Sequence, residues 1–423
     1  MPCHLTLVPV QIGEGLSTAA PPQQESRPFD SLPIEVIRDI FVIASTTGTP
    51  DHLETFPFIA RLVSKLWNAI ITSTPAAWTY PIIDSYPIWR HRIARHMVYR
   101  GDLPLHVEIL VRPTSRILAY RPRDGPDRWF HLPTFDDLHC VRILRFVTDT
   151  STPPNAVFPL IFLLNIDQTP GWVNIRSLEL VGNGSKCIKV GIPLIQGFTE
   201  FLSCFPMLQR LFLDKFLFSN DREEINNDET RRTLPCLREL RFKGVNSNTL
   251  ALLVFFTAPL LDTIAIDCYS DDVEEMPDVN PFLPSAISSN VVHRSVRNVL
   301  LYNIPSQRDV VNILSIVPEA RHLALSIQSD DQILEQLQPG IKRLCLNLIS
   351  LAVYPTLPPS PKSLQTLIEA RLPTLKMLEL GSCVTNARVN QPDFDSLKEH
   401  VDLRFMSEKE MEFDHVLDRL RRR

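Results

Sequence analysis

The apolar residues near the start of the chain recur at helical spacing. In the segment SLPIEVIRDIFVIAS, residues 31–45, they return every three or four positions, and Ser31 and Pro33 suit the start of a helix. The same spacing recurs over residues 59–71, where the apolar side chains fall on one helical face. The pattern therefore predicts a small three-helix domain at residues 29–80.

The segments on either side of this domain differ in character. Residues 1–28 are rich in Pro, Gln and Ser and show no sustained period, which predicts a flexible tail. Residues 81–135 contain a helical stretch around 88–97, followed by the alternating apolar residues of a strand at 105–109. This segment is predicted to be a helical linker that leads into the first strand of a larger body.

The rest of the chain repeats one short pattern, apolar-x-x-apolar-x-apolar. The copies are VRILRF (141–146), IRSLEL (175–180), LQRLFL (208–213), LRELRF (237–242), LDTIAI (261–266), VRNVLL (296–301), ARHLAL (320–325), IKRLCL (341–346) and LKMLEL (375–380). The middle apolar residues of successive copies are 21 to 35 residues apart. A constant core with spacers of variable length is typical of a repeat that contributes one strand and one return segment.

The segments between copies carry helical periodicity, as in LIQGFTEFLSCFP (194–206) and NTLALLVFFTAP (248–259). Each unit is therefore predicted to be a helix, a proline-marked turn and a strand. A single unit cannot bury its apolar face, so the units must stack into a solenoid with a parallel sheet along one side. The expected fold class is α/β, with an irregular solenoid at 136–390 and a charged helical cap at 391–423.

The strands of such a solenoid direct alternate side chains to its concave face. In each copy the last two apolar residues of the pattern point into the core, and the residues beside them point outward. The candidate partner-binding residues at these outward positions are Arg210, Phe212, Glu239, Arg241, Lys243, Tyr302, His322 and Arg343. Their chemistry is mixed, which suits the recognition of a protein better than that of a nucleic acid.

Composition narrows the classes of partner. The formal net charge is −5, with 43 basic and 48 acidic residues, so charge alone cannot hold a nucleic acid or an anionic membrane. No apolar run reaches the roughly 18 to 20 residues of a membrane span, and the N-terminal segment lacks the features of a secretory signal. The eight cysteines are dispersed, without a CxxC pair. We expect a protein of the cytoplasm, the nucleus or both, without a metal or a cofactor.

The segment LPIEVIRDIF, followed by LVSKLWNAIITSTPAAW, resembles the F-box, a small helical docking domain. The matching positions are Leu32, Pro33, Glu35, Val36, Ile40, Phe41, Val63, Ser64, Trp67, Ile70, Pro75 and Trp78. The continuation IWRHRIARHMVYRGDLPLHVEI is similar to the segment that follows the F-box in many fungal members. The repeats resemble divergent leucine-rich repeats, although they carry no asparagine ladder.

The resemblance implies a substrate-receptor subunit of a Skp–cullin–F-box ubiquitin ligase. The F-box helices would dock the Skp adaptor, and the repeats would select the protein to be ubiquitinated. The residues expected to dock the adaptor are Leu32, Pro33, Glu35, Val36, Ile40, Phe41, Val63 and Trp67. The chain itself would have no catalytic residue, because ubiquitin transfer belongs to other subunits.

Two other interpretations stay open on the sequence. The repeats could form a scaffold that assembles partner proteins without any role in a ligase. The chain could instead be a hydrolase whose residues meet only in three dimensions, although the sequence has no HExxH motif, no GxSxG elbow and no obvious Cys–His signature. A deep pocket with converging titratable groups would favour the hydrolase, and a shallow curved groove would count against it.

Overall fold

The computed structural model of the chain describes most of the helical domain and of the repeats. The described residues are 32–47, 56–83, 89–111, 140–148, 173–182, 188–190, 193–218, 231–245, 249–268, 291–304, 306–326, 331–339, 344–354, 360–372, 374–381, 397–407 and 409–422. The tail predicted at residues 1–28 and the candidate binding residue Arg343 lie outside the described residues.

The first described elements form a small helical module. They are α1 (Ile34–Thr46), α3 (Phe56–Val63), α4 (Lys65–Thr72) and the short helix η2 (Pro75–Trp78). The single helix predicted over 59–71 is wrong, because the structure has two helices there. Ser64 has an extended backbone, and its hydroxyl accepts a hydrogen bond from the backbone N–H of Trp67 at 3.1 Å. Ser64 therefore acts as an N-cap that ends one helix and starts the next.

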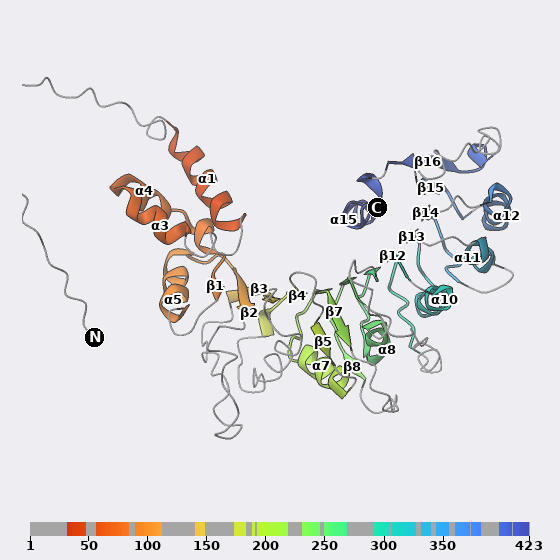
Figure 1. The fold of residues 1–423 in the computed structure, drawn as a ribbon, viewed down its shortest axis with the longest axis horizontal. Coiled ribbons are helices and arrows are strands. Elements are labelled where there is room, and N and C mark those ends of the chain that lie inside the picture. Colours follow the sequence, from red (N-terminus) through yellow and green to blue (C-terminus); the bar gives the residue numbers. More distant parts are fainter. Residues whose placement is uncertain are drawn as a thin grey trace, which may run out of the picture.

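Among the described residues, twelve parallel strands follow and form one curved, open sheet (Figure 1). In order across the sheet they are β1 (Ile82–Ile83), β2 (Leu105–Val111), β3 (Val141–Thr148), β4 (Ser177–Gly182), β6 (Arg210–Asp214), β9 (Glu239–Lys243), β11 (Thr263–Asp267), β12 (Asn298–Tyr302), β13 (His322–Ser326), β14 (Ser350–Val353), β15 (Met377–Gly381) and β16 (Asp402–Met406). Two small additional sheets pair β5 (Ile188–Val190) with β7 (Phe216–Phe218) and β8 (Arg232–Thr233) with β10 (Phe256–Thr257). Because β1 and β16 do not pair, the described strands do not close into a barrel.

Helices cover the outer side of the curve (Figure 1). They are α5 (Trp89–Tyr99), α7 (Pro193–Ser203), α8 (Leu252–Phe255), preceded by η7 (Thr249–Ala251), α10 (Gln307–Ile316), α11 (Asp331–Gln336) and α12 (Pro361–Arg371). Their buried side chains, such as Phe198, Leu314 and Leu367, share one core with the sheet. The α/β prediction is thereby confirmed. None of the described helices combines the length and the apolar character that a membrane crossing requires.

The sequence pattern also predicts the register of the strands. Eight of the nine predicted copies coincide with strands of the large sheet. The middle apolar residue of each copy pairs with that of its neighbour, as Leu144 does with Leu178 and Leu178 with Leu211. The same ladder continues through Leu240, Ile264, Val299 and Leu323. All of these side chains are buried, so the repeated apolar position forms the spine of the core.

The copy predicted at 341–346 is wrong. Its described residues form a turn, and the strand comes later as β14, where Leu351 takes the ladder position. The segment LISLAV (348–353) carries the same apolar pattern and supplies this strand. The turn before it has the backbone hydrogen bond of the other repeats, from the N–H of Leu348 to the carbonyl of Cys345 at 3.1 Å. Arg371 of α12 is buried and also stabilises this turn, because its guanidinium donates hydrogen bonds to the carbonyls of Leu344 and Cys345 at 2.6 and 2.5 Å.

The C-terminal segment differs from the cap predicted at 391–423. The strand β16 extends the sheet, and η9 (Lys409–Met411) and α15 (Phe413–Arg421) follow it. Figure 1 shows α15 within the curve, on the face of the sheet opposite the outer helices. The segment therefore covers part of the inner face instead of closing the end of the array.

Candidate interaction surfaces

The helical module presents apolar side chains to solvent. On α3, Ile59, Leu62 and Val63 lie at positions i, i+3 and i+4 and share one side of the helix, and Leu62 is 85% exposed. Leu66 at the start of α4 is exposed as well. We call these four residues the α3 face. Since soluble proteins seldom leave neighbouring large apolar side chains uncovered, the α3 face is a candidate docking surface.

The docking residues predicted from the sequence fall into three groups. Pro33, Glu35, Val36 and Val63 are exposed, Leu32, Ile40 and Trp67 are half-buried, and Phe41 is 1% exposed. The ring centroid of Phe41 lies 5.0 Å from that of Trp67 and 5.8 Å from that of Phe56. Phe41 is therefore a core residue of the module and does not reach its surface. The prediction also missed Ile59, Leu62 and Leu66, although their helical spacing is visible in the sequence.

A buried tryptophan joins the module to the first units of the array. Trp78 is fully buried, and its indole N–H donates a hydrogen bond to the carbonyl of Ile71 at 2.8 Å. Nδ1 of His96, from α5, lies 2.7 Å from the carbonyl of Trp78. Because that carbonyl can only accept, Nδ1 carries the proton. Burial lowers the pKa of His96 to about 4, so the ring is neutral near pH 7.

The inner face of β2, β3 and β4 carries a charged cluster. Arg145 pairs with Glu108 at 3.2 Å and with Glu179 at 3.5 Å, across neighbouring strands. Tyr80 donates a hydrogen bond to Glu108 at 2.7 Å, and burial together with that carboxylate raises the pKa of Tyr80 to about 12. Since Glu108 is almost fully buried, Arg145 and Tyr80 together satisfy a carboxylate that would otherwise be costly to bury.

The helix α15 covers the inner face of β11 to β14. The central inner-face residues of these strands are small or apolar, namely Ala265, Leu300, Ala324 and Ala352. The residues of α15 that pack with them in one buried cluster are Phe413, Val416, Leu417 and Leu420. Alanines let a helix approach a sheet closely, and burying each large apolar side chain contributes about 1.5–3 kcal/mol. These strands are therefore buried on both faces.

Polar contacts flank this apolar interface. Arg241 and Lys243 of β9 both pair with Asp414, the latter at 3.6 Å, and Arg421 pairs with Glu239. On the side of the interface toward β15, Arg419 of α15 lies 3.8 Å from the buried carboxylate of Glu379 and donates a hydrogen bond to the Tyr354 hydroxyl at 3.0 Å. The Tyr302 hydroxyl also donates to the carbonyl of Met411. Charges at both ends of α15 thus match charges on the sheet.

The predicted partner-binding residues are only partly available on this face. Arg210 is exposed, Phe212 and His322 are half-buried, and Tyr302 is 7% exposed. Glu239, Arg241 and Lys243 pair with residues of α15. The structure brings most of the predicted residues together, but it shows that part of the expected open surface is occupied by the chain itself. The prediction is wrong for Tyr302, which lies beneath η9 and α15.

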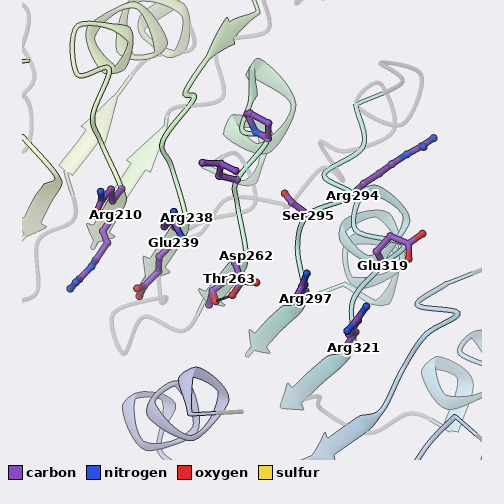
Figure 2. Close-up of a pocket in the computed structure, with 13 residues that line it drawn as sticks. Arg210, Arg238, Glu239, Asp262, Thr263, Arg294, Ser295, Arg297, Glu319 and Arg321 are labelled. Atoms are coloured by element: carbon purple, nitrogen blue, oxygen red, sulfur yellow. Dashed lines mark hydrogen bonds between the residues drawn. The ribbon is translucent and has the colours of Figure 1, made fainter.

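A hollow of about 830 Å³ lies along the N-terminal ends of β6, β9, β11, β12 and β13 (Figure 2). It is lined by Gln209, Arg210, Arg238, Glu239, Pro259, Leu260, Asp262, Thr263, Arg294, Ser295, Arg297, Glu319 and Arg321. Of these residues, only Arg210 and Glu239 were predicted from the sequence. The missed signal was a basic residue at the second position of the copies, at Arg238, Arg297 and Arg321.

The described residues with strongly shifted pKa values lie away from this hollow. Burial raises the pKa of the Cys268 thiol, which therefore stays protonated, and burial lowers the pKa of His293. Among the residues that the structure describes, no three His, Cys, Asp or Glu side chains come together as possible ligands of a metal ion. No protein-family model matches the chain, and no curated protein matches it at a significant level.

Proposed function

We propose that this chain is a non-catalytic substrate receptor of a Skp–cullin–F-box ubiquitin ligase. The helical module acts as the F-box and binds the Skp adaptor, while the divergent leucine-rich repeats bind the protein to be ubiquitinated. The chain promotes ubiquitin transfer by proximity alone, because it holds the target near a ubiquitin-loaded enzyme supplied by other subunits. The proposal combines the F-box-like sequence with the surface properties of the module.

The α3 face is the observation that carries the proposal. Leu62, Val63 and Leu66 are exposed although a helical module of this size needs its apolar side chains for its own core. That core is complete without them, since Ile37, Phe41, Ile71 and Trp78 are buried and packed together. The exposed apolar residues of the α3 face are not needed for that core. They are therefore suited to form the central apolar patch of a protein interface.

The repeats would present a composite surface to the target. Since α15 covers β11 to β14, a target meets the exposed side of α15 and the charged inner face of the earlier strands. Asp414 and Asp418 are exposed on α15, and Arg145 is part-exposed on β3. A surface of mixed charge favours a specific protein partner through complementary potentials.

Calorimetric titration with a purified Skp adaptor tests the proposal. Full-length chain carrying Leu62→Asp and Val63→Asp should bind the adaptor at least about 100-fold more weakly, because two charges enter an apolar interface. The matched control is Val98→Asp on α5, where the side chain is 74% exposed but lies outside the α3 face. Val98→Asp should leave both adaptor binding and the thermal transition unchanged.

Two results would overturn the proposal. One is a wild-type chain that shows no adaptor binding at micromolar concentration. The other is equal adaptor affinity in the wild type and in the Leu62→Asp, Val63→Asp variant. A circular dichroism spectrum that matches the wild type shows that the variant has kept its fold, so that lost binding can be assigned to the α3 face.

A further inference from the structure

A row of arginines borders the hollow at the N-terminal ends of the strands. The residue just before the strand is Arg238 at β9, Arg297 at β12 and Arg321 at β13, and Asp262 takes this position at β11. Backbone hydrogen bonds join these positions, with the N–H of Arg297 donating to the carbonyl of Asp262 at 2.9 Å and that of Arg321 to Arg297 at 2.8 Å. The ladder sets their side chains in a single row (Figure 2).

The positive charge of this row is not balanced within the described part of the chain. Arg238, Arg297 and Arg321 are exposed, and their guanidinium groups form no ion pair or hydrogen bond with any described residue. Because neighbouring strands are about 4.8 Å apart, the backbones of Arg297 and Arg321 lie at roughly that spacing, so two like charges stand on adjacent positions. Like charges on adjacent strands destabilise each other, and an anion seated between them removes that repulsion.

The carboxylates that line the hollow are already engaged by other groups. Glu239 pairs with Arg421 of α15. Asp262 accepts a hydrogen bond from the amide of Asn298 at 2.9 Å, and Glu319 accepts one from Asn347 at 2.8 Å. The five arginines of the lining also outnumber its three carboxylates. The described residues that line the hollow therefore carry a net positive charge, although the formal net charge of the chain is −5.

We propose that this hollow binds an acidic peptide segment of a partner protein, with a carboxylate or phosphate group seated between Arg297 and Arg321. Guanidinium groups bind both kinds of anion through paired, charge-assisted hydrogen bonds. The inference deepens the proposed function, on which it rests for the role of the bound segment as part of the target. Peptide binding itself can be measured without any adaptor, so the two proposals can fail separately.

A peptide fits the hollow better than a nucleic acid does. Single-stranded nucleic acids bind through aromatic side chains that stack on the bases, and none of the described residues that line the hollow is Phe, Tyr, Trp or His. From β6 to β13 the hollow crosses four strand spacings, about 19 Å, the length of about six residues of extended peptide.

Fluorescence anisotropy with labelled peptides of about ten residues tests the proposal on the full-length chain. One peptide alternates glutamate and serine, a second replaces the glutamates by glutamine, and a third has the glutamine sequence with phosphorylated serines. The glutamate peptide, the phosphopeptide or both should bind, more weakly as salt rises, and the neutral peptide should not. The stronger of the two anionic peptides identifies carboxylate or phosphate as the recognised group.

Paired substitutions locate the binding site. Arg297→Gln with Arg321→Gln should weaken binding of the anionic peptide by about tenfold or more. Lys65→Gln with Lys362→Gln removes the same charge from exposed positions elsewhere and should leave binding unchanged. Glu319→Gln should strengthen binding severalfold, a gain that a folding defect cannot imitate.

Any of three results would overturn the proposal. The first is that neither anionic peptide binds the wild-type chain more tightly than the neutral peptide. The second is that the arginine variant binds the anionic peptides as the wild type does. The third is that a single-stranded DNA oligonucleotide of similar charge binds the hollow more tightly than either peptide, which would assign it to nucleic acids.

Discussion

Arg241 and Asp414 are 173 residues apart in the sequence, and their side chains form an ion pair between strand β9 and helix α15. The guanidinium carbon of Arg241 also lies 4.5 Å from the ring centroid of Phe212 and 5.3 Å from that of Phe413. One side chain of the sheet thus holds the chain's own C-terminal helix by charge and by aromatic contact. A partner that binds the inner face of β11 to β14 must first displace α15.

The buried residues of α15 should determine how firmly this helix stays on the sheet. Leu417 is 1% exposed, so Leu417→Ala should weaken docking by about 2–3 kcal/mol. Amide hydrogen exchange in residues 413–421 should then become about 30-fold faster or more, while exchange in α12 stays as in the wild type. His415→Ala, at an exposed position on the same helix, is the control. Unchanged exchange in the Leu417→Ala variant would contradict the described packing.

Arg371 should be a major contributor to stability although it makes no ion pair with a described residue. It is 2% exposed, and burial lowers its pKa. Its guanidinium also donates a hydrogen bond from Nε to the carbonyl of Leu337 at 2.8 Å. Arg371→Met leaves several buried carbonyls without donors and should lower the free energy of unfolding by about 3 kcal/mol or more. Urea titration measures this change.

Arg308 supplies the control for this prediction, because its side chain is exposed on α10. In the same urea titration, Arg308→Met should change the free energy of unfolding by no more than about 0.5 kcal/mol. If Arg371→Met proves equally mild, the guanidinium does not hold the turn at Leu344 and Cys345 as described.

The stability of the helical module should fall in mild acid because of His96. The pKa of His96 is about 4 in the folded chain and about 6.5 when unfolded, so the unfolded state binds more protons between these values. The contribution of neutral His96 to the free energy of unfolding is therefore fully present above pH 6.5. It is lost as the pH falls towards 4, which lowers the stability by up to about 3 kcal/mol. Burial also lowers the pKa of His293, which lies in the array before β12, so the array should lose stability in acid as well.

A single substitution isolates the contribution of His96. In His96→Gln the side-chain amide can still donate to the Trp78 carbonyl but does not titrate. Thermal unfolding at pH 7.5, 6 and 5 should show a smaller loss of stability in this variant than in the wild type. Identical pH profiles for the two proteins would show that His96 is not the titrating group.

Much of the fold could be predicted because the repeated apolar pattern is also the physical cause of the stacking. Leu144 and its equivalents recur in the sequence because each must fill the same place in the core. The failure at 341–346 has a local origin, because two neighbouring segments, IKRLCL and LISLAV (348–353), carry the same pattern. Only the second pairs in the sheet, where Leu351 takes the ladder position.

The inner face was predicted less well, although two sequence patterns are consistent with the helix α15 covering it. The strands TIAID, NVLLY, HLALS and SLAV are apolar at successive positions, which is typical of strands buried on both faces. Phe413, Val416, Leu417 and Leu420 lie at positions i, i+3, i+4 and i+7 of a helix. Their contact joins segments that are far apart in the sequence, so pattern alone could not pair them.

Hydrogen exchange of the full-length chain, with and without an equimolar purified Skp adaptor, tests the proposed docking most directly. If the α3 face docks the adaptor, exchange should slow in the backbone amides of α3 and α4, around Leu62 and Leu66, and should not change in α10 and α12. Absence of any protection, or protection confined to the strands and outer helices of the array, would contradict it.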